Sequence, residues 1–201
     1  MMNIANILTL SRIGLAVIFF FLIQARSVSA VIVAGILFLV AVLTDYYDGY
    51  FAKKYNLVSD FGKLMDPIAD KFLILVAFFV FVRMGLVGGV AFFLIFLRET
   101  VLTGFRLMAM TKGQILAAET AGKLKTAFQM LTILVILVFW VVRRIDPFQP
   151  WDDVSRQSFL SFANGTTNVL MFVVVCLTLY SGGLYLWNNR GVFFPSSEKQ
   201  T

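Results

Sequence analysis

Six apolar runs recur along the chain, and charged residues lie on their flanks. The runs cover residues 13–23, 31–43, 72–82, 86–97, 130–142 and 169–179. Most of them are shorter than the about 20 residues that an α-helix needs to cross the hydrocarbon core of a membrane. Each run must therefore be completed by its flanks. This pattern predicts an all-α integral membrane protein, built as a bundle of about six transmembrane helices.

The composition excludes an ordinary water-soluble domain. The chain is 60% hydrophobic and 14% charged, with a mean hydropathy of +0.87, whereas soluble domains contain about 25% charged residues. We expect one membrane domain over residues 1–201, ending in a polar tail at 195–201. The first run also fits a cleaved signal peptide, because Arg12 precedes it and Val28-Ser29-Ala30 resembles a cleavage site. The five runs that follow favour a retained helix.

Four aspartates fall where the second predicted helix ends and the third begins: Asp45, Asp48, Asp66 and Asp70. Each carboxylate costs about 2.5–3.5 kcal/mol at the centre of a bilayer, so the group needs a function. On a helix, the first pair lies about 60° apart and the second about 40° apart, so each pair shares one face. Two such faces brought together form an all-oxygen site suited to hard divalent cations.

The fourth and fifth predicted helices carry basic residues at the same membrane depth, since the charged halves of antiparallel helices meet on one side. They include Arg98, Arg106 and Lys125, with Glu99 beside the first. Lipid cannot face so many charges, so these halves are expected to line a polar cavity. This side carries 12 of the 17 lysines and arginines, which predicts that the cavity opens to the cytoplasm. The pair Arg143-Arg144 on the opposite side is the main counter-evidence.

Residues 45–70 follow the spacing D-x2-D-G-x2-A-K-x8-G-x3-D-x3-D. This spacing resembles the signature of the CDP-alcohol phosphotransferase family, which are membrane enzymes that transfer a phosphoryl-alcohol group from a CDP-linked donor to an acceptor hydroxyl. Seven of the eight signature positions match. The departure is Lys53, where the family usually has Arg.

The resemblance implies a metal-dependent transferase with a pair of Mg²⁺ or Mn²⁺ ions. It implies metal ligands at Asp45, Asp48, Asp66 and Asp70, and it makes Asp70 the base that takes the proton of the acceptor hydroxyl. The chain has no histidine, so a carboxylate, lysine or tyrosine must do this work. The expected contacts to the nucleotide and its lipid are Asn6, Thr9, Gly49, Ala52, Lys53, Ser59 and Gly62, where the small residues let a phosphate approach the backbone.

Three further segments resemble the phosphatidylglycerophosphate synthase branch of that family: residues 6–12, the stretch from Arg98-Glu99 to Arg106, and residues 122–129. This implies CDP-diacylglycerol as donor and glycerol 3-phosphate as acceptor, with no nucleic acid. Arg98, Arg106 and Lys125 are then expected to bind the acceptor phosphate. Alternatively, Arg98 and Glu99 neutralise each other. Other members with a different acceptor (inositol phosphate or phosphatidylglycerol), or a cation transporter, stay open. Homodimerisation is expected from the family alone.

The remaining segments carry weaker predictions. Residues 145–164 include Pro150, Asp152 and Asp153 and are predicted to form the longest loop, with room for a short interfacial helix, on the extracytoplasmic side. Trp151 and Tyr185 are predicted as anchors at the membrane interface. Cys176 is the only cysteine of the chain, so it forms no intramolecular disulfide, and we expect it to be a small buried hydrophobic residue.

Overall fold

The backbone of residues 4–25, 27–55, 60–111, 120–145 and 152–190 is described by a computed structural model. Side chains are described for residues 10–25, 27–44, 68–69, 71–109, 122–145 and 152–190. Six helices follow one another in these ranges: α1 (Ile4–Ile23), α2 (Val28–Tyr55), α3 (Asp60–Arg83), α4 (Gly89–Thr111), α5 (Thr120–Ile145) and α6 (Asp153–Asn188). The expected all-α architecture is confirmed.

Each apolar run forms part of a helix that continues into the charged flanks. The helices are 20 to 36 residues long, and at about 1.5 Å per residue even the shortest measures about 30 Å. α2 continues past its apolar run to Tyr55, and α3 begins at Asp60, twelve residues before its run. α3 ends in a Schellman motif, in which Leu86 N–H donates to the Phe81 carbonyl at 2.9 Å and Gly85 adopts a φ of 71°. Glycine is favoured there because a left-handed conformation strains residues with a Cβ atom.

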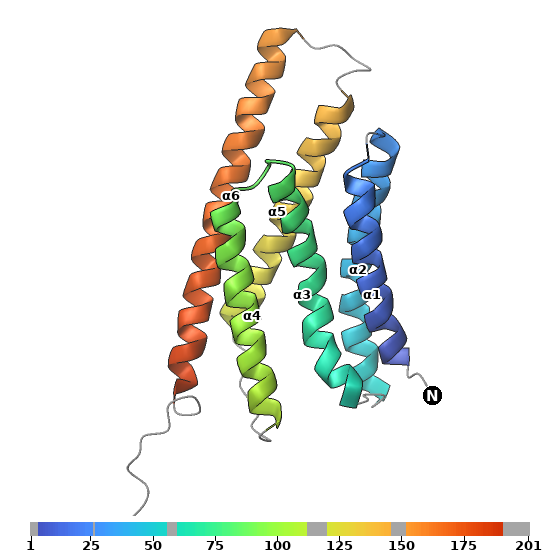
Figure 1. The fold of residues 1–201 in the computed structure, drawn as a ribbon, viewed down its shortest axis with the longest axis vertical. Helices are drawn as coiled ribbons and strands as arrows, with labels where there is room; N and C mark the ends of the chain where they lie inside the picture. Colours follow the sequence, from blue (N-terminus) through green and yellow to red (C-terminus); the bar gives the residue numbers. More distant parts are fainter. Residues whose placement is uncertain (1–3, 26, 56–59, 112–119, 146–151, 191–201) are drawn as a thin grey trace, which may run out of the picture.

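The helices run along one common axis (Figure 1). α1 packs against α2 and α3, while α6 packs against α4 and α5. α3 contacts both α4 and α5, and α2 also contacts α5, so these contacts connect the two groups. In Figure 1, the end of α2, the start of α3 and the end of α4 lie at the lower end of the bundle, and α5 begins in its lower half. The charged halves predicted from the sequence therefore share one end of the bundle.

The predicted loop at 145–164 is wrong from Asp153 onward, because α6 already begins there. Asp152 caps this helix: its backbone is extended and its carboxylate accepts a hydrogen bond from Ser155 N–H at 3.2 Å. Such a cap satisfies one of the four amide donors that a helix start leaves unpaired. Polar residues can therefore extend α6 beyond the apolar run, and Figure 1 shows this extension rising above the other helices. Residues 146–151, including Trp151, lie outside the described residues.

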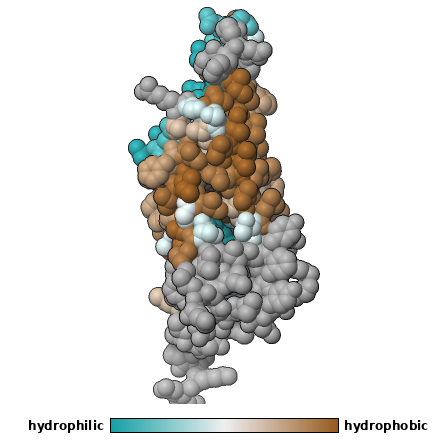
Figure 2. Space-filling model, turned by 90° about the vertical axis from the view of Figure 1, so that its right-hand side faces the viewer, coloured by the Kyte–Doolittle hydropathy of each residue, from teal (hydrophilic) through white to brown (hydrophobic). Residues whose placement is uncertain are grey.

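Large apolar side chains cover the outside of the bundle as well as its core. Phe19, Phe38 and Phe78 are fully buried, whereas Phe21 and Phe172 are 67% and 70% exposed. Figure 2 shows this apolar surface as a broad band along one face. An exposed apolar surface of this extent is typical of a surface that faces a membrane or another protein. Cys176 lies on the exposed surface, so the prediction that it is buried is wrong.

Two of the described helices contain segments long and apolar enough to cross a membrane, Gly122–Ile145 and Asp153–Asn188. Shorter apolar segments occur at Leu10–Ile23 and Val28–Thr44. The helix lengths, the exposed apolar side chains and these segments together are those of a helical membrane protein.

Candidate functional site

The four signature aspartates lie in the two helices that meet at the charged end of the bundle. Asp45 and Asp48 belong to α2, and Asp66 and Asp70 belong to α3. Each pair lies within an uninterrupted helix. The helical spacing that places the two aspartates of a pair on one face therefore holds in the structure. Their side chains lie outside the described residues, and the metal assignment stays a prediction. The described side chains alone include no group of three or more metal-ligating residues.

The residues expected at the nucleotide belong to the same end of the bundle. Asn6 and Thr9 lie near the start of α1, Gly49, Ala52 and Lys53 near the end of α2, and Gly62 near the start of α3. These helix ends are together at the lower end of Figure 1. Ser59 lies outside the described residues. The backbone thus brings six of the seven positions to one end, and their contacts stay predictions.

A buried carboxylate, Glu99, accepts hydrogen bonds from side chains of α4 and α5. Glu99 of α4 accepts hydrogen bonds from Lys125 Nζ and from Gln129 Nε2 of α5, the latter at 3.4 Å, and from Arg98 Nη1 at 3.3 Å. Glu99 and Lys125 are 2% and 1% exposed, and Gln129 is fully buried. Removing charges from water costs several kcal/mol per ion unless they are paired. We call Arg98, Glu99, Lys125, Gln129 and Ser181 the Glu99 cluster.

Arg98 connects this cluster to α6. Its Nη2 donates to Ser181 Oγ at 3.0 Å, and the Ser181 hydroxyl in turn donates to the Thr178 carbonyl at 3.2 Å. Glu99 is therefore shared by two cations, and the cluster as a whole keeps a net positive charge. The alternative in which Arg98 and Glu99 neutralise each other accounts for the ion pair between them, but it leaves the charge of Lys125 in excess.

Lys71 adds a further positive charge from α3. It acts electrostatically on both Glu99 and Lys125, and it directly follows Asp70 in the sequence. The excess positive charge of the cluster thus lies next to the helix that carries the signature acids. Lys71 was not among the residues predicted at the site, although its position directly after Asp70 was a signal that could have found it.

Arg106 is not part of the Glu99 cluster. It lies eight residues after Arg98, or about 12 Å along α4, and its guanidinium carbon is 5.7 Å from the ring centre of Tyr185 on α6. Tyr185 is 3% exposed, so the prediction that it anchors the protein at the membrane interface is wrong. The structure brings two of the three expected acceptor-binding cations together and places the third nearer the end of the bundle.

Residues of α6 also contact the arginines of this site, and the sequence did not predict this. This helix supplies a partner to each arginine of α4, Ser181 to Arg98 and Tyr185 to Arg106. The signal that could have found it is the run Ser181-Gly182-Gly183, which follows the apolar run of this helix. Small residues of this kind let helices approach closely in membranes.

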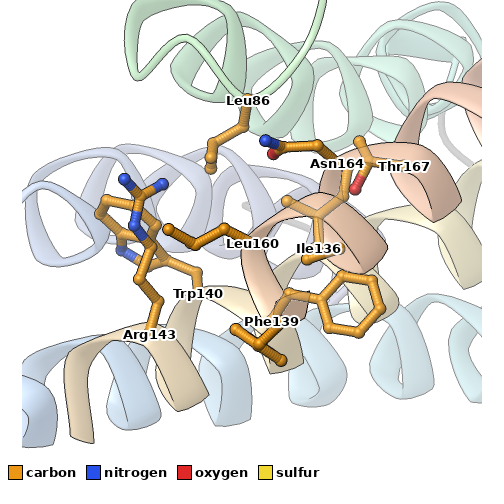
Figure 3. A pocket seen from close by; sticks show the side chains of 10 residues that line it. Leu86, Ile136, Phe139, Trp140, Arg143, Leu160, Asn164 and Thr167 are labelled. Carbon is orange, nitrogen blue, oxygen red and sulfur yellow. The ribbon is translucent and has the colours of Figure 1, made fainter. Parts of the chain in front are cut away.

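A small pocket lies at the opposite end of the bundle, between α5, α6 and Leu86 (Figure 3). Its volume is about 20 Å³, which is room for roughly one water molecule. Trp140 lines it, with the guanidinium carbons of Arg143 and Arg144 at 5.6 and 4.7 Å from its ring centre. Neither a nucleotide nor a lipid headgroup fits in this volume.

These features define a helical membrane protein with acid-bearing and base-bearing helix ends at one end of a bundle. Comparison with known proteins identifies its family. Residues 2–180 match the family model described as CDP-alcohol phosphatidyltransferase, and the chain belongs to this family. Ser181 and Tyr185 lie just beyond the matched residues.

Three of the curated relatives that the chain matches carry the same enzyme name. A protein of Bacillus subtilis (strain 168) named CDP-diacylglycerol–glycerol-3-phosphate 3-phosphatidyltransferase is 37% identical over 150 residues, which covers 69% of this chain and 78% of the relative. A protein of Rickettsia typhi with the same name is 30% identical over 186 residues, covering 92% of this chain and 96% of the relative. A third, from Mycoplasma pneumoniae, is 44% identical over 102 residues, covering 51% and 45%.

Proposed function

We propose that this protein transfers the phosphatidyl group of CDP-diacylglycerol to sn-glycerol 3-phosphate, giving phosphatidylglycerophosphate and CMP. The names of the relatives support this reaction. One observation on the structure carries it further: two cations, Arg98 and Lys125, share one buried acid, Glu99, and Lys71 lies within electrostatic reach of it. A phosphorylated acceptor needs such an excess of positive charge, whereas a neutral alcohol does not.

The signature acids suit a divalent metal cofactor. Asp45, Asp48, Asp66 and Asp70 offer only carboxylate oxygens, the donor type that Mg²⁺ and Mn²⁺ prefer, and they come from two consecutive helices at one end of the bundle. These aspartates would hold such ions, which would supply positive charge to the pyrophosphate of the donor and to the departing CMP.

The protein's own residues then have separate tasks in one displacement. Asp70 takes the proton of the acceptor hydroxyl, whose oxygen forms a bond to the phosphorus that carries diacylglycerol. The bond from this phosphorus to the oxygen of CMP breaks, and CMP leaves with that oxygen. Lys53 binds the donor phosphates as a point charge, where Arg would offer a two-pronged fork. Asn6, Thr9, Gly49, Ala52, Ser59 and Gly62 are proposed to surround the nucleotide.

We also propose that all six helices span the cell membrane, with the charged end in a polar cavity open to the cytoplasm and a homodimer as the assembly. The excess of lysines and arginines at that end supports this orientation. Single cysteines at positions 56 and 149, in a Cys176→Ser background, test it. A membrane-impermeant thiol reagent should reach position 56 only from the cytoplasmic side and position 149 only from outside. The reverse labelling would overturn the orientation.

The reaction itself is tested with purified protein, CDP-diacylglycerol and a panel of acceptors. CMP release should depend on glycerol 3-phosphate and on Mg²⁺ or Mn²⁺, and should be far slower with inositol phosphate, phosphatidylglycerol or glycerol. Equal release with all acceptors would contradict the assignment, and no release with any of them would contradict the transferase reading as a whole.

A further inference from the structure

Arg98 is held on α6 by two neighbouring features. The first is its hydrogen bond to Ser181 Oγ at 3.0 Å. Ser181 is 1% exposed and gives its own proton to the Thr178 carbonyl. Because its proton is used in this bond, the hydroxyl oxygen of Ser181 can only accept a hydrogen bond from the guanidinium. The bond to the Thr178 carbonyl thus orients Ser181 as the acceptor of Arg98.

The second feature is the missing side chain at Gly182. A Cβ atom built there would lie 3.2 Å from Arg98 Cγ and 3.4 Å from Arg98 Nε. The distance to Cγ is shorter than ordinary van der Waals contact and the distance to Nε is at its lower limit, so the arginine side chain would have to shift slightly. It cannot shift easily, because Glu99 and Ser181 already hold its guanidinium. A Cβ atom at position 182 would therefore push Arg98 away by a few tenths of an ångström.

We propose that Ser181 and Gly182 are positioning residues: they hold Arg98 so that its guanidinium presents a fixed donor to the phosphate of the acceptor. The inference rests on the proposed function for the role of Arg98, and it adds α6 to the site. Glu99 alone does not fix the arginine, since it also accepts from Lys125 and Gln129. A guanidinium held from a second helix loses less freedom on binding, which favours affinity for its ligand.

The chain offers a matched control for each substitution. Gly182→Ala introduces the contact with Arg98, while Gly183→Ala adds the same methyl group one residue later, where nothing lies within 4 Å. Both changes raise helix propensity by a similar amount. Ser181→Ala removes the acceptor of Arg98, while Thr178→Val removes a buried hydroxyl that has no hydrogen-bond partner among the described residues.

The kinetic readout is the KM for each substrate, measured as CMP release. Ser181→Ala and Gly182→Ala should each raise the KM for glycerol 3-phosphate by roughly two- to tenfold, the range expected for one hydrogen bond. The KM for CDP-diacylglycerol and the maximal rate should change by less than about twofold. Gly183→Ala and Thr178→Val should keep the wild-type values. Equal changes in both KM values, or control variants that behave like the test variants, would overturn the inference.

A second readout does not depend on activity. Gly182→Ala should lower the melting temperature in the wild-type background but not in an Arg98→Ala background, because alanine lacks the atoms that the new methyl group meets. Gly183→Ala should show no such dependence on Arg98. If Gly182→Ala costs the same in both backgrounds, the contact is absent and the inference falls. If the dependence is present but the acceptor KM is unchanged, the contact holds, and it is the role of Arg98 in the proposed function that falls.

Discussion

Glu99→Gln tests whether the buried carboxylate holds the Glu99 cluster together. Gln keeps the size of the side chain and removes the charge that faces Lys125 and Arg98. Lys125 is 1% exposed, so its ammonium group would remain in a site almost without water. Removing one partner of a buried ion pair costs about 3–5 kcal/mol, because an uncompensated charge is left behind. In a chain of this size, such a loss lowers the melting temperature by roughly 6–20 °C.

The assay is thermal unfolding of the purified protein in detergent micelles, followed by the loss of helical circular dichroism. A double variant, Glu99→Gln with Lys125→Met, removes both charges and serves as the control. It should recover most of the lost stability, because replacing a whole buried ion pair by uncharged groups of similar volume is often neutral. Its activity should stay low, since the double variant lacks a proposed ligand of the acceptor phosphate.

Two results would refute this reasoning. A fall of less than about 3 °C for Glu99→Gln would mean that the pair is more hydrated than its burial implies. A double variant no more stable than the single one would mean that the loss comes from packing or hydrogen bonding, with no part for the charge of Lys125.

Three further predictions follow from the described contacts and the proposed chemistry. Asp70→Asn should abolish CMP release while the donor still binds, because a general base is needed only in the chemical step; near-normal turnover would contradict this role. Arg106→Gln should lower kcat/KM for glycerol 3-phosphate by about 10- to 150-fold and change that for glycerol little, whereas equal losses with both acceptors would make Arg106 structural. Hydrogen bonds from the Ser155 hydroxyl and then from the Ser155 amide lower the pKa of Asp152, so this cap should stabilise α6 above the unfolded pKa near 3.8 and lose its effect as pH falls through the lower, folded value. Hydrogen exchange at the start of α6 in wild type and Asp152→Ala should therefore differ at neutral pH and converge once the pH has fallen below the folded pKa. A difference that does not depend on pH would contradict this prediction.

The sequence by itself determined the helices and the composition of their ends. Each of the six apolar runs is too short to cross a membrane alone, so its flanks had to continue the helix. α2 and α3 do continue beyond their apolar runs, to Tyr55 and from Asp60. The signature spacing placed the acids within α2 and α3, because helical periodicity is a local property of the chain. The same spacing pointed to the family that the comparison confirms. Local signals also explain the one wrong element, since the cap at Asp152 was present in the sequence but was interpreted as part of a loop.

Only the tertiary structure decided which side chains meet. Arg98 and Ser181 are 83 residues apart, and Glu99 and Lys125 are 26 apart, so no local pattern joins them. The sequence also did not predict which side chains are buried. Cys176 is exposed and Tyr185 is buried, and both findings are opposite to the prediction. The physical reason is that lipid and protein interior are both apolar, so hydrophobicity does not distinguish the lipid-facing side of a membrane helix from its packed side. Which face of α6 receives the arginines of α4 is set by close packing at small residues, and that depends on the fold.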